Sequence, residues 1–251
     1  MRQTDQYGRF GTPPPVPGRP SAFPGSLAVL LAALFTVVTW QVAVGGPLAR
    51  ADERWSRAAL AGRLPEGVAE LLADLGSVAV AVPVLVLVAA YVAWRARGAG
   101  VPRWWRPSVA ALVPMAAVPL LVVPLKELIA RSGPPVMGPG TGFYPSGHTA
   151  TATVAYGAAT LLLLPWLGGA YARRELTIAC CVLNLGVGLG LVRRGYHWPL
   201  DVVGSWCLGG LLVLGLWWFL GSTGSTGSTG RGGRGGGPAL SDASDSGPGS
   251  P

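Results

Sequence analysis

Charged residues are scarce in this chain of 251 residues: Asp, Glu, Lys and Arg make up 12% of it, whereas 50% of the residues are hydrophobic. A soluble domain carries roughly twice as much charge. Lysine occurs once, histidine twice and cysteine three times. The cysteines lie inside apolar segments, and two of them are adjacent, so they give no information on the redox compartment. The composition excludes an ordinary soluble protein and favours a membrane protein.

Long apolar segments also favour a membrane protein. A helix rises about 1.5 Å per residue, so each segment is long enough to cross roughly 30 Å of hydrocarbon. We therefore expect an all-α fold, an integral membrane bundle of six transmembrane helices over residues 26–220. The six charge-free segments are Ser26–Gly45, Gly76–Trp94, Ser108–Leu125, Thr149–Leu167, Leu176–Val192 and Val202–Leu220.

The ends of the chain have a different composition. Residues 1–25 and the Gly/Ser/Thr-rich residues 221–251 lack apolar periodicity, so we predict a disordered leader and a disordered tail. Between the first two spans, Pro47–Leu75 has an Ala/Leu/Glu/Arg pattern that suits a short amphipathic helix at the membrane surface.

The net charge of +8 raises the question of nucleic acid binding. Eighteen of the nineteen basic residues are arginines, and they are scattered through loops and termini rather than gathered in one cluster, so we predict no nucleic acid partner. With the amino terminus inside, eleven basic residues fall on the inner side and eight on the outer side. This bias predicts a multi-pass protein of the cell membrane with both termini in the cytoplasm.

The rarest polar side chains lie at the ends of spans. Lys126 follows the third span, His148 lies in Pro-Ser-Gly-His before the fourth, and His197 lies in His-Trp-Pro-Leu-Asp before the sixth. In the six-span topology all three motifs face outward. Ionisable residues at such positions typically mark function, so we predict one site on the outer face.

The spacing of His197 and Asp201 favours nucleophilic chemistry. Residues four apart share one helical face, so the carboxylate accepts a hydrogen bond from one ring nitrogen and fixes the tautomer. The other nitrogen then carries a free lone pair that attacks phosphorus. His148 fits the proton donor that the leaving group needs. The plainer interpretation is that the histidine and the aspartate only satisfy each other at a span end.

Phosphate binding is predicted around these residues. Ser146 and Gly147 offer a hydroxyl and an open backbone N–H at a helix start, where phosphate oxygens are favoured. Lys126 and nearby arginines would neutralise charge in the transition state. In the plainer alternatives the Ser-Gly-His sequence is only a helix cap and the basic side chains extend to the membrane interface. Two histidines and an aspartate without a usable thiolate are a thin ligand set, so we predict neither a metal nor another cofactor.

These motifs resemble those of the type 2 phosphatidic acid phosphatase family, which are Lys-x6-Arg-Pro, Pro-Ser-Gly-His and Ser-Arg-x5-His-x3-Asp. The second is complete, and the third retains His197 and Asp201. The resemblance covers about residues 76–220. It implies a six-helix bundle, dephosphorylation of a lipid phosphate or diphosphate without a metal, His197 as the nucleophile and His148 as the acid.

Two motif arginines are absent from their usual places. Gly133 stands at the arginine position of the first motif, and Leu191 stands at that of the third. Arg131 lies in the same loop as Gly133, and Arg193 or Arg194 lies about one helical turn before the histidine of the third motif. We expect Arg131 and, of the last pair, Arg194 to compensate as phosphate ligands.

These departures leave other functions open. A catalytically weakened member would bind a lipid phosphate, or serve as a membrane scaffold, without hydrolysing it. A transporter would have polar residues deep inside spans, and only Asn184 fits that description. For an enzyme, polyprenyl diphosphate, phosphatidate and phosphatidylglycerophosphate carry the same terminal group, so all three are candidate substrates; the oligomeric state stays open.

Overall fold

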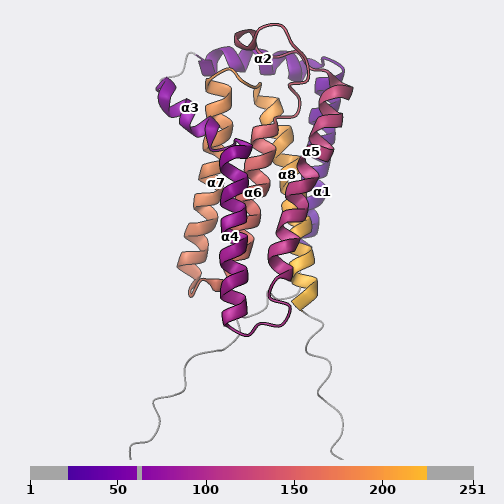
Figure 1. Cartoon of the computed structure of the whole chain (residues 1–251). Helices are drawn as coiled ribbons and strands as arrows, with labels where there is room; N and C mark the ends of the chain where they lie inside the picture. The colour runs from indigo at the N-terminus through magenta and orange to yellow at the C-terminus, as the bar shows by residue number, and fades with distance from the viewer. Residues whose placement is uncertain (1–21, 61–63, 225–251) are drawn as a thin grey trace, which may run out of the picture.

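The structure, a computed structural model, describes residues 22–60 and 64–224, and it contains no strand within those ranges. Figure 1 shows long helices side by side, with α2 lying across one end of the bundle. The α-helices are α1 (Ala22–Ala43), α2 (Pro47–Leu60), α3 (Glu66–Asp74), α4 (Val78–Gly98), α5 (Arg106–Ile129), α6 (Gly147–Leu163), α7 (Ala170–Arg193) and α8 (Pro199–Gly224). The 3-10 helices are η1 (Pro135–Met137) and η2 (Leu164–Trp166).

The all-α membrane bundle is confirmed. Five helices, α1, α4, α5, α7 and α8, are long and apolar enough to cross a membrane. The predicted fourth span corresponds to α6, which has 17 residues and continues directly into η2. Eleven of the α6 residues are buried, and the helix packs against α4, α5, α7 and α8. The shortest of the six helices therefore forms the axis of the bundle.

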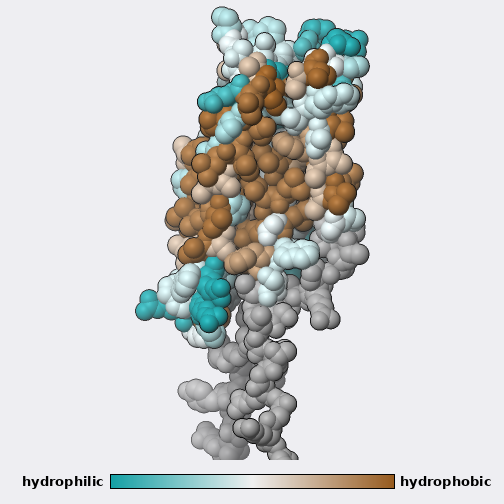
Figure 2. All heavy atoms as spheres, turned by 90° about the vertical axis from the view of Figure 1, so that its right-hand side faces the viewer, coloured by the Kyte–Doolittle hydropathy of each residue, from teal (hydrophilic) through white to brown (hydrophobic). Residues whose placement is uncertain are grey.

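The outer surface of the bundle is apolar. Figure 2 shows a band of hydrophobic side chains around the middle of one face, with hydrophilic residues at both ends. Large apolar side chains of the long helices are exposed: Leu30 of α1 is 62% exposed, Leu87 of α4 69% and Leu120 of α5 74%. Such exposure is unfavourable in water but not in hydrocarbon. The band is the surface expected of a multi-pass membrane protein.

The loop between the first two spans holds two helices where the sequence suggested one. The face of α2 that points into the protein carries Ala49, Asp52 and Ser56, which are all buried. The α3 helix packs on α7 so closely that a Cβ atom on Gly190 would lie 2.5 Å from the carbonyl oxygen of Ala69. Glycine at position 190 therefore allows α3 to rest on α7.

The ends of the bundle differ slightly from the expected bounds. Helix α1 already begins at Ala22, and α8 runs to Gly224, so four residues assigned to the leader and four assigned to the tail are helical. The rest of the predicted disordered leader and tail lies outside the described residues. Figure 1 shows the start of α1 and the end of α8 at the end of the bundle opposite to α2.

Candidate active site

A pocket of about 420 Å³ lies at the end of the bundle that α2 covers, and it brings the rarest side chains of the chain together. Both histidines and the single lysine contribute to its wall, although they come from different parts of the sequence. The lining residues are Lys126, Met137, Thr141, Gly142, Phe143, His148, Leu191, Tyr196 and His197. The sequence prediction of a single site thus agrees with the placement of Lys126, His148 and His197.

Each of these three residues lies at a helix end or next to one. Lys126 lies in the last turn of α5, where Nζ donates a hydrogen bond of 2.8 Å to the carbonyl oxygen of Gly142. His148 is the second residue of α6. His197 lies in the short loop between α7 and α8, where its backbone N–H donates to the carbonyl oxygen of Leu191 at 3.4 Å. Helix ends therefore set the positions of all three groups.

Asp201 holds the ring of His197. The ring Nδ1 lies 3.2 Å from Oδ2 of Asp201, and the same oxygen accepts the backbone N–H of Trp198 at 3.0 Å. Because an ionised carboxylate only accepts, Nδ1 carries the proton and Nε2 is left with a lone pair. His197 precedes α8 by two residues, so the contact spans the helix start rather than one turn within the helix.

Ser146 acts as the N-cap of α6. Its Oγ accepts the backbone N–H of Thr149 at 3.3 Å and the Thr149 hydroxyl at 3.1 Å, and the side chain is fully buried. Neither Ser146 nor Gly147 is among the pocket-lining residues. The capping interpretation is therefore observed, and direct phosphate binding by Ser146 and Gly147 stays a prediction.

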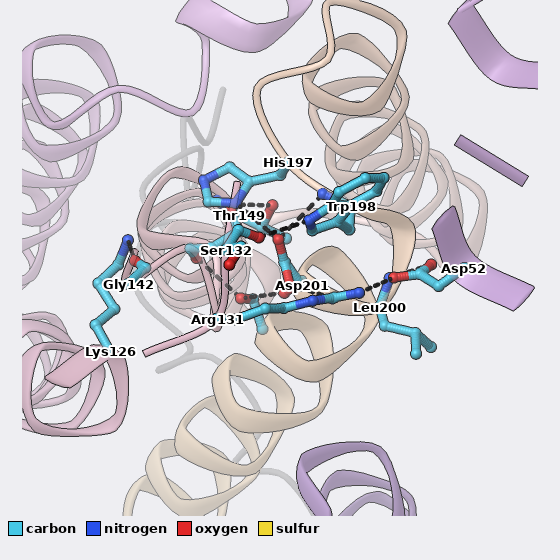
Figure 3. Close-up of polar contacts among 12 residues, drawn as sticks. Asp52, Lys126, Arg131, Ser132, Gly142, Thr149, His197, Trp198, Leu200 and Asp201 are labelled. Carbon is cyan, nitrogen blue, oxygen red and sulfur yellow. Dashed lines mark hydrogen bonds and ion pairs between the residues drawn. The ribbon is translucent and has the colours of Figure 1, made fainter. Parts of the chain in front are cut away.

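Arg131 is enclosed by two carboxylates (Figure 3). Its Nη1 donates to Oδ1 of Asp201 at 2.6 Å, and its Nη2 donates to Oδ2 of Asp52 at 2.8 Å. Both carboxylates are fully buried, and the arginine side chain is 8% exposed. The guanidinium also lies over the ring of Trp198, 5.5 Å from its centroid. Arg131 does not line the pocket, so this placement does not favour its predicted role as a phosphate ligand.

Asp52 is the polar residue at this site that sequence reasoning missed. Its Oδ1 accepts the backbone N–H of Leu200, 148 residues away, at 2.9 Å. Burial raises the pKa of Asp52 from 3.8 to about 6, against the opposite effects of Arg131 and the Leu200 N–H. The available signal was an aspartate between Ala49 and Ser56 on one face of an amphipathic helix, but many exposed acids occupy similar positions.

Arg194 lies outside the pocket as well. Its Nε donates to Glu70 at 2.6 Å and its Nη1 to Glu66 at 3.2 Å, so it links the end of α7 to α3. The Tyr196 hydroxyl also donates to Glu70, and this bond, ahead of Arg194, lowers the pKa of Glu70. Arg193 likewise donates to the carbonyl oxygen of Leu64. The predicted phosphate contact of Arg194 is not favoured by this placement.

The two positions without motif arginines are filled by apolar packing. A Cβ atom on Gly133 would lie 2.5 Å from the ring of Phe143, and that ring packs edge-on against His197 with centroids 5.9 Å apart. Leu191 is 1% exposed, and its side chain lines the pocket. Among the lining residues, Lys126 is thus the only lysine or arginine.

The architecture defines a class: a multi-pass helical membrane protein with a His-Asp pair, a second histidine and a lysine around one pocket. Residues 107–224 match the family model described as the PAP2 superfamily, and this confirms the resemblance read from the motifs. No curated protein matches the chain at a significant level.

The fold is similar to that of a solved membrane protein. The crystal structure described as that of the first transmembrane PAP2 type phosphatidylglycerolphosphate phosphatase from Bacillus subtilis matches with a TM-score of 0.65. The match has 24% sequence identity and covers 84% of this chain and 100% of the other. This match shows that the two proteins share a membrane fold.

Proposed function

We propose that this protein hydrolyses a lipid phosphate or diphosphate at the outer face of the membrane through a phosphohistidine intermediate. The observation that carries the proposal is the His197 ring, which is held at Nδ1 by Asp201 in a pocket that it shares with His148 and Lys126. A histidine with one nitrogen fixed and the other free is suited to attack phosphorus.

The first half of the reaction transfers the phosphoryl group to the protein. The lone pair on Nε2 of His197 forms a bond to phosphorus while the bond to the leaving-group oxygen breaks. His148 gives its proton to that oxygen, which leaves as an alcohol or as a lipid monophosphate. Asp201 stabilises the positive charge that develops on the His197 ring.

The second half of the reaction hydrolyses the phosphohistidine and regenerates the free His197 side chain. His148, now neutral, takes a proton from water as the water oxygen attacks phosphorus, and the bond between phosphorus and Nε2 breaks. The Lys126 ammonium has three N–H donors. One donates to the carbonyl oxygen of Gly142, so two remain for phosphate oxygens. The N-terminal backbone N–H groups of α6, including that of Gly147, add a favourable dipole. No step in this scheme needs a metal ion.

Apolar surface next to the pocket supports an amphiphilic substrate. Met137 of η1 lines the pocket and is 44% exposed, and its neighbour Val136 is 62% exposed. An acyl or prenyl chain attached to the bound phosphate would lie along such a surface. In the expected six-span topology eleven basic residues fall on the side of both termini and eight on the other side, which supports a cytoplasmic position for both termini and hence an outward-facing pocket.

One observation favours a second candidate function. Because Lys126 is the only lysine or arginine among the lining residues, and Gly133 and Leu191 replace motif arginines, the site holds fewer phosphate ligands than the family motifs imply. A weakened member would bind the phosphate or act as a scaffold without turnover.

Phosphate release separates the two candidates. The detergent-purified protein is assayed with EDTA present on polyprenyl diphosphate, phosphatidate and phosphatidylglycerophosphate, and His197→Ala is assayed alongside. Release that the variant loses supports the proposal, and phosphate trapped on the protein by acid-sensitive labelling identifies the intermediate. A folded wild-type protein that releases nothing from all three lipids would contradict hydrolysis and favour the binding function.

A further inference from the structure

The Arg131 guanidinium is built into the protein rather than presented to the pocket. Each of its two terminal nitrogens is paired with a fully buried carboxylate, one from α2 and one from α8. Ser132, the next residue, accepts the indole N–H of Trp198 through its carbonyl oxygen at 2.9 Å. These contacts fix both the side chain and the backbone of this loop against the start of α8.

The two oxygens of Asp201 serve different partners. Oδ1 accepts from Arg131, whereas Oδ2 lies against Nδ1 of His197 and accepts the N–H of Trp198 (Figure 3). A carboxylate held on one edge by a guanidinium cannot rotate freely about its side chain. Arg131 therefore decides which oxygen faces the histidine.

Asp52 completes the arrangement from α2. One of its oxygens pairs with Arg131, and the other accepts the N–H of Leu200 in the first turn of α8. The turn that carries Asp201 is thus tied directly to α2. Without Asp52, both the guanidinium and this backbone N–H would lose a buried partner, which is costly in a low-dielectric environment.

The charges of Asp52, Arg131 and Asp201 also affect the His197 ring. Arg131 alone would cancel the negative charge of Asp201. Above the raised pKa of Asp52, about 6, both carboxylates that surround the guanidinium are ionised, so the buried group keeps one net negative charge behind the His197 ring. That charge stabilises the positive ring that forms when Nε2 bonds to phosphorus.

We propose that Asp52 and Arg131 are positioning residues of the active site, which act through Asp201 to orient the His197 ring and to keep a net negative charge behind it. This inference rests on the proposed function and deepens it. It makes α2, outside the family-matched region, part of the catalytic apparatus.

The first test separates positioning from phosphate binding. Asp52→Asn and Arg131→Gln should each lower kcat about tenfold or more with little change in KM, because misplacing a catalytic group affects the chemical step. Asp52→Glu, which keeps the charge, should retain more activity than Asp52→Asn. Glu53→Gln is the matched control, because it removes the same charge from the exposed face of α2 and should leave kcat unchanged.

A direct phosphate contact by Arg131 predicts the opposite pattern. Arg131→Gln would then raise KM and weaken inhibition by inorganic phosphate, and Asp52→Asn would leave kcat unchanged. That result would overturn the inference while leaving hydrolysis by His197 intact, so the two proposals can fail separately.

The second test does not need turnover. Because the chain has two histidines, 15N-histidine labelling gives ring nitrogen signals from two imidazoles, and His148→Gln assigns them. Loss of one negative charge behind the ring should move the titration of His197 in Asp52→Asn to lower pH by about half a unit or more. An unchanged titration would overturn the inference even if no lipid is hydrolysed.

The other ionisable groups around the ring are unchanged in this variant. The titration shift therefore reports the α2 charge alone. These groups are Asp201 of α8, Arg131 of the loop after α5, His148 of α6, Lys126 of α5 and Tyr196 of the loop before α8.

Discussion

Replacing Asp52 by asparagine should change how the stability of the protein depends on pH. Asp52 is fully buried, and burial raises its pKa from 3.8 to about 6, although Arg131 pairs with it. A carboxyl with a raised folded-state pKa binds its proton more tightly in the folded protein than in the unfolded one. Its stabilising contribution is therefore complete below about pH 3.8 and is lost as the pH rises through about 6.

The size of the effect follows from the difference between the two pKa values. About 2.2 units at 1.36 kcal/mol per unit give about 3 kcal/mol, an order-of-magnitude figure for the free energy of unfolding lost between pH 4 and pH 7. For a domain of this size, 1 kcal/mol corresponds to about 2–4 °C in Tm. Asparagine does not titrate, so the Tm of the wild type should fall relative to that of Asp52→Asn by about 6–12 °C over this range.

Thermal unfolding of the two proteins in one detergent, followed by circular dichroism between pH 4 and pH 7.5, measures this difference. Glu53→Gln, on the exposed side of α2, supplies the background for the loss of one negative charge. If the wild type instead gains stability over Asp52→Asn as the pH rises, the ion pair with Arg131 outweighs desolvation and the reasoning is refuted.

Three further variants test the pocket and its surroundings. Leu191→Arg adds a cation to the pocket wall and should lower KM for a lipid diphosphate about tenfold, since a charge-assisted hydrogen bond contributes about 1.5–3 kcal/mol; an unchanged KM, with Leu191→Met as the uncharged control, would argue against this. Gly133→Ala places a Cβ atom against the Phe143 ring and should lower kcat by displacing that ring from the nucleophile, and Phe143→Leu in the same chain should restore part of the activity. Arg194→Gln should lower Tm slightly and change KM by less than about twofold, because the exposed pair with Glu70 is structural; a large rise in KM would instead return Arg194 to the role of a phosphate ligand.

Local patterns in the sequence were sufficient to predict the membrane spans and part of the candidate site. Charge-free segments of 17 to 20 residues predict membrane helices because backbone polar groups in hydrocarbon must bond within the segment. His197 and Asp201 are four positions apart, so local geometry is enough to bring the two side chains together. The topology also predicts that Lys126, His148 and His197 lie at the same end of the bundle, because alternate loops of a six-span protein share one side of the membrane.

Such local patterns could not predict contacts between segments that are distant in the sequence. Arg131 and Arg194 both lie near the motifs, and both pair with acids from the loop between the first two spans, Asp52 in one case and Glu70 in the other. Spacing along the chain says nothing about which carboxylate approaches a given arginine over 79 or 124 residues. Gly190 likewise depends on how closely α3 approaches α7.

The sequence by itself determined that this is a membrane bundle with its histidines and lysine at one end, because hydrophobic length and local spacing act through short stretches of chain. Only the tertiary structure decided which polar groups pair with one another. The buried charges of Asp52, Arg131 and Asp201 are tolerable only as a connected group, and that connection forms when α2 folds over the start of α8.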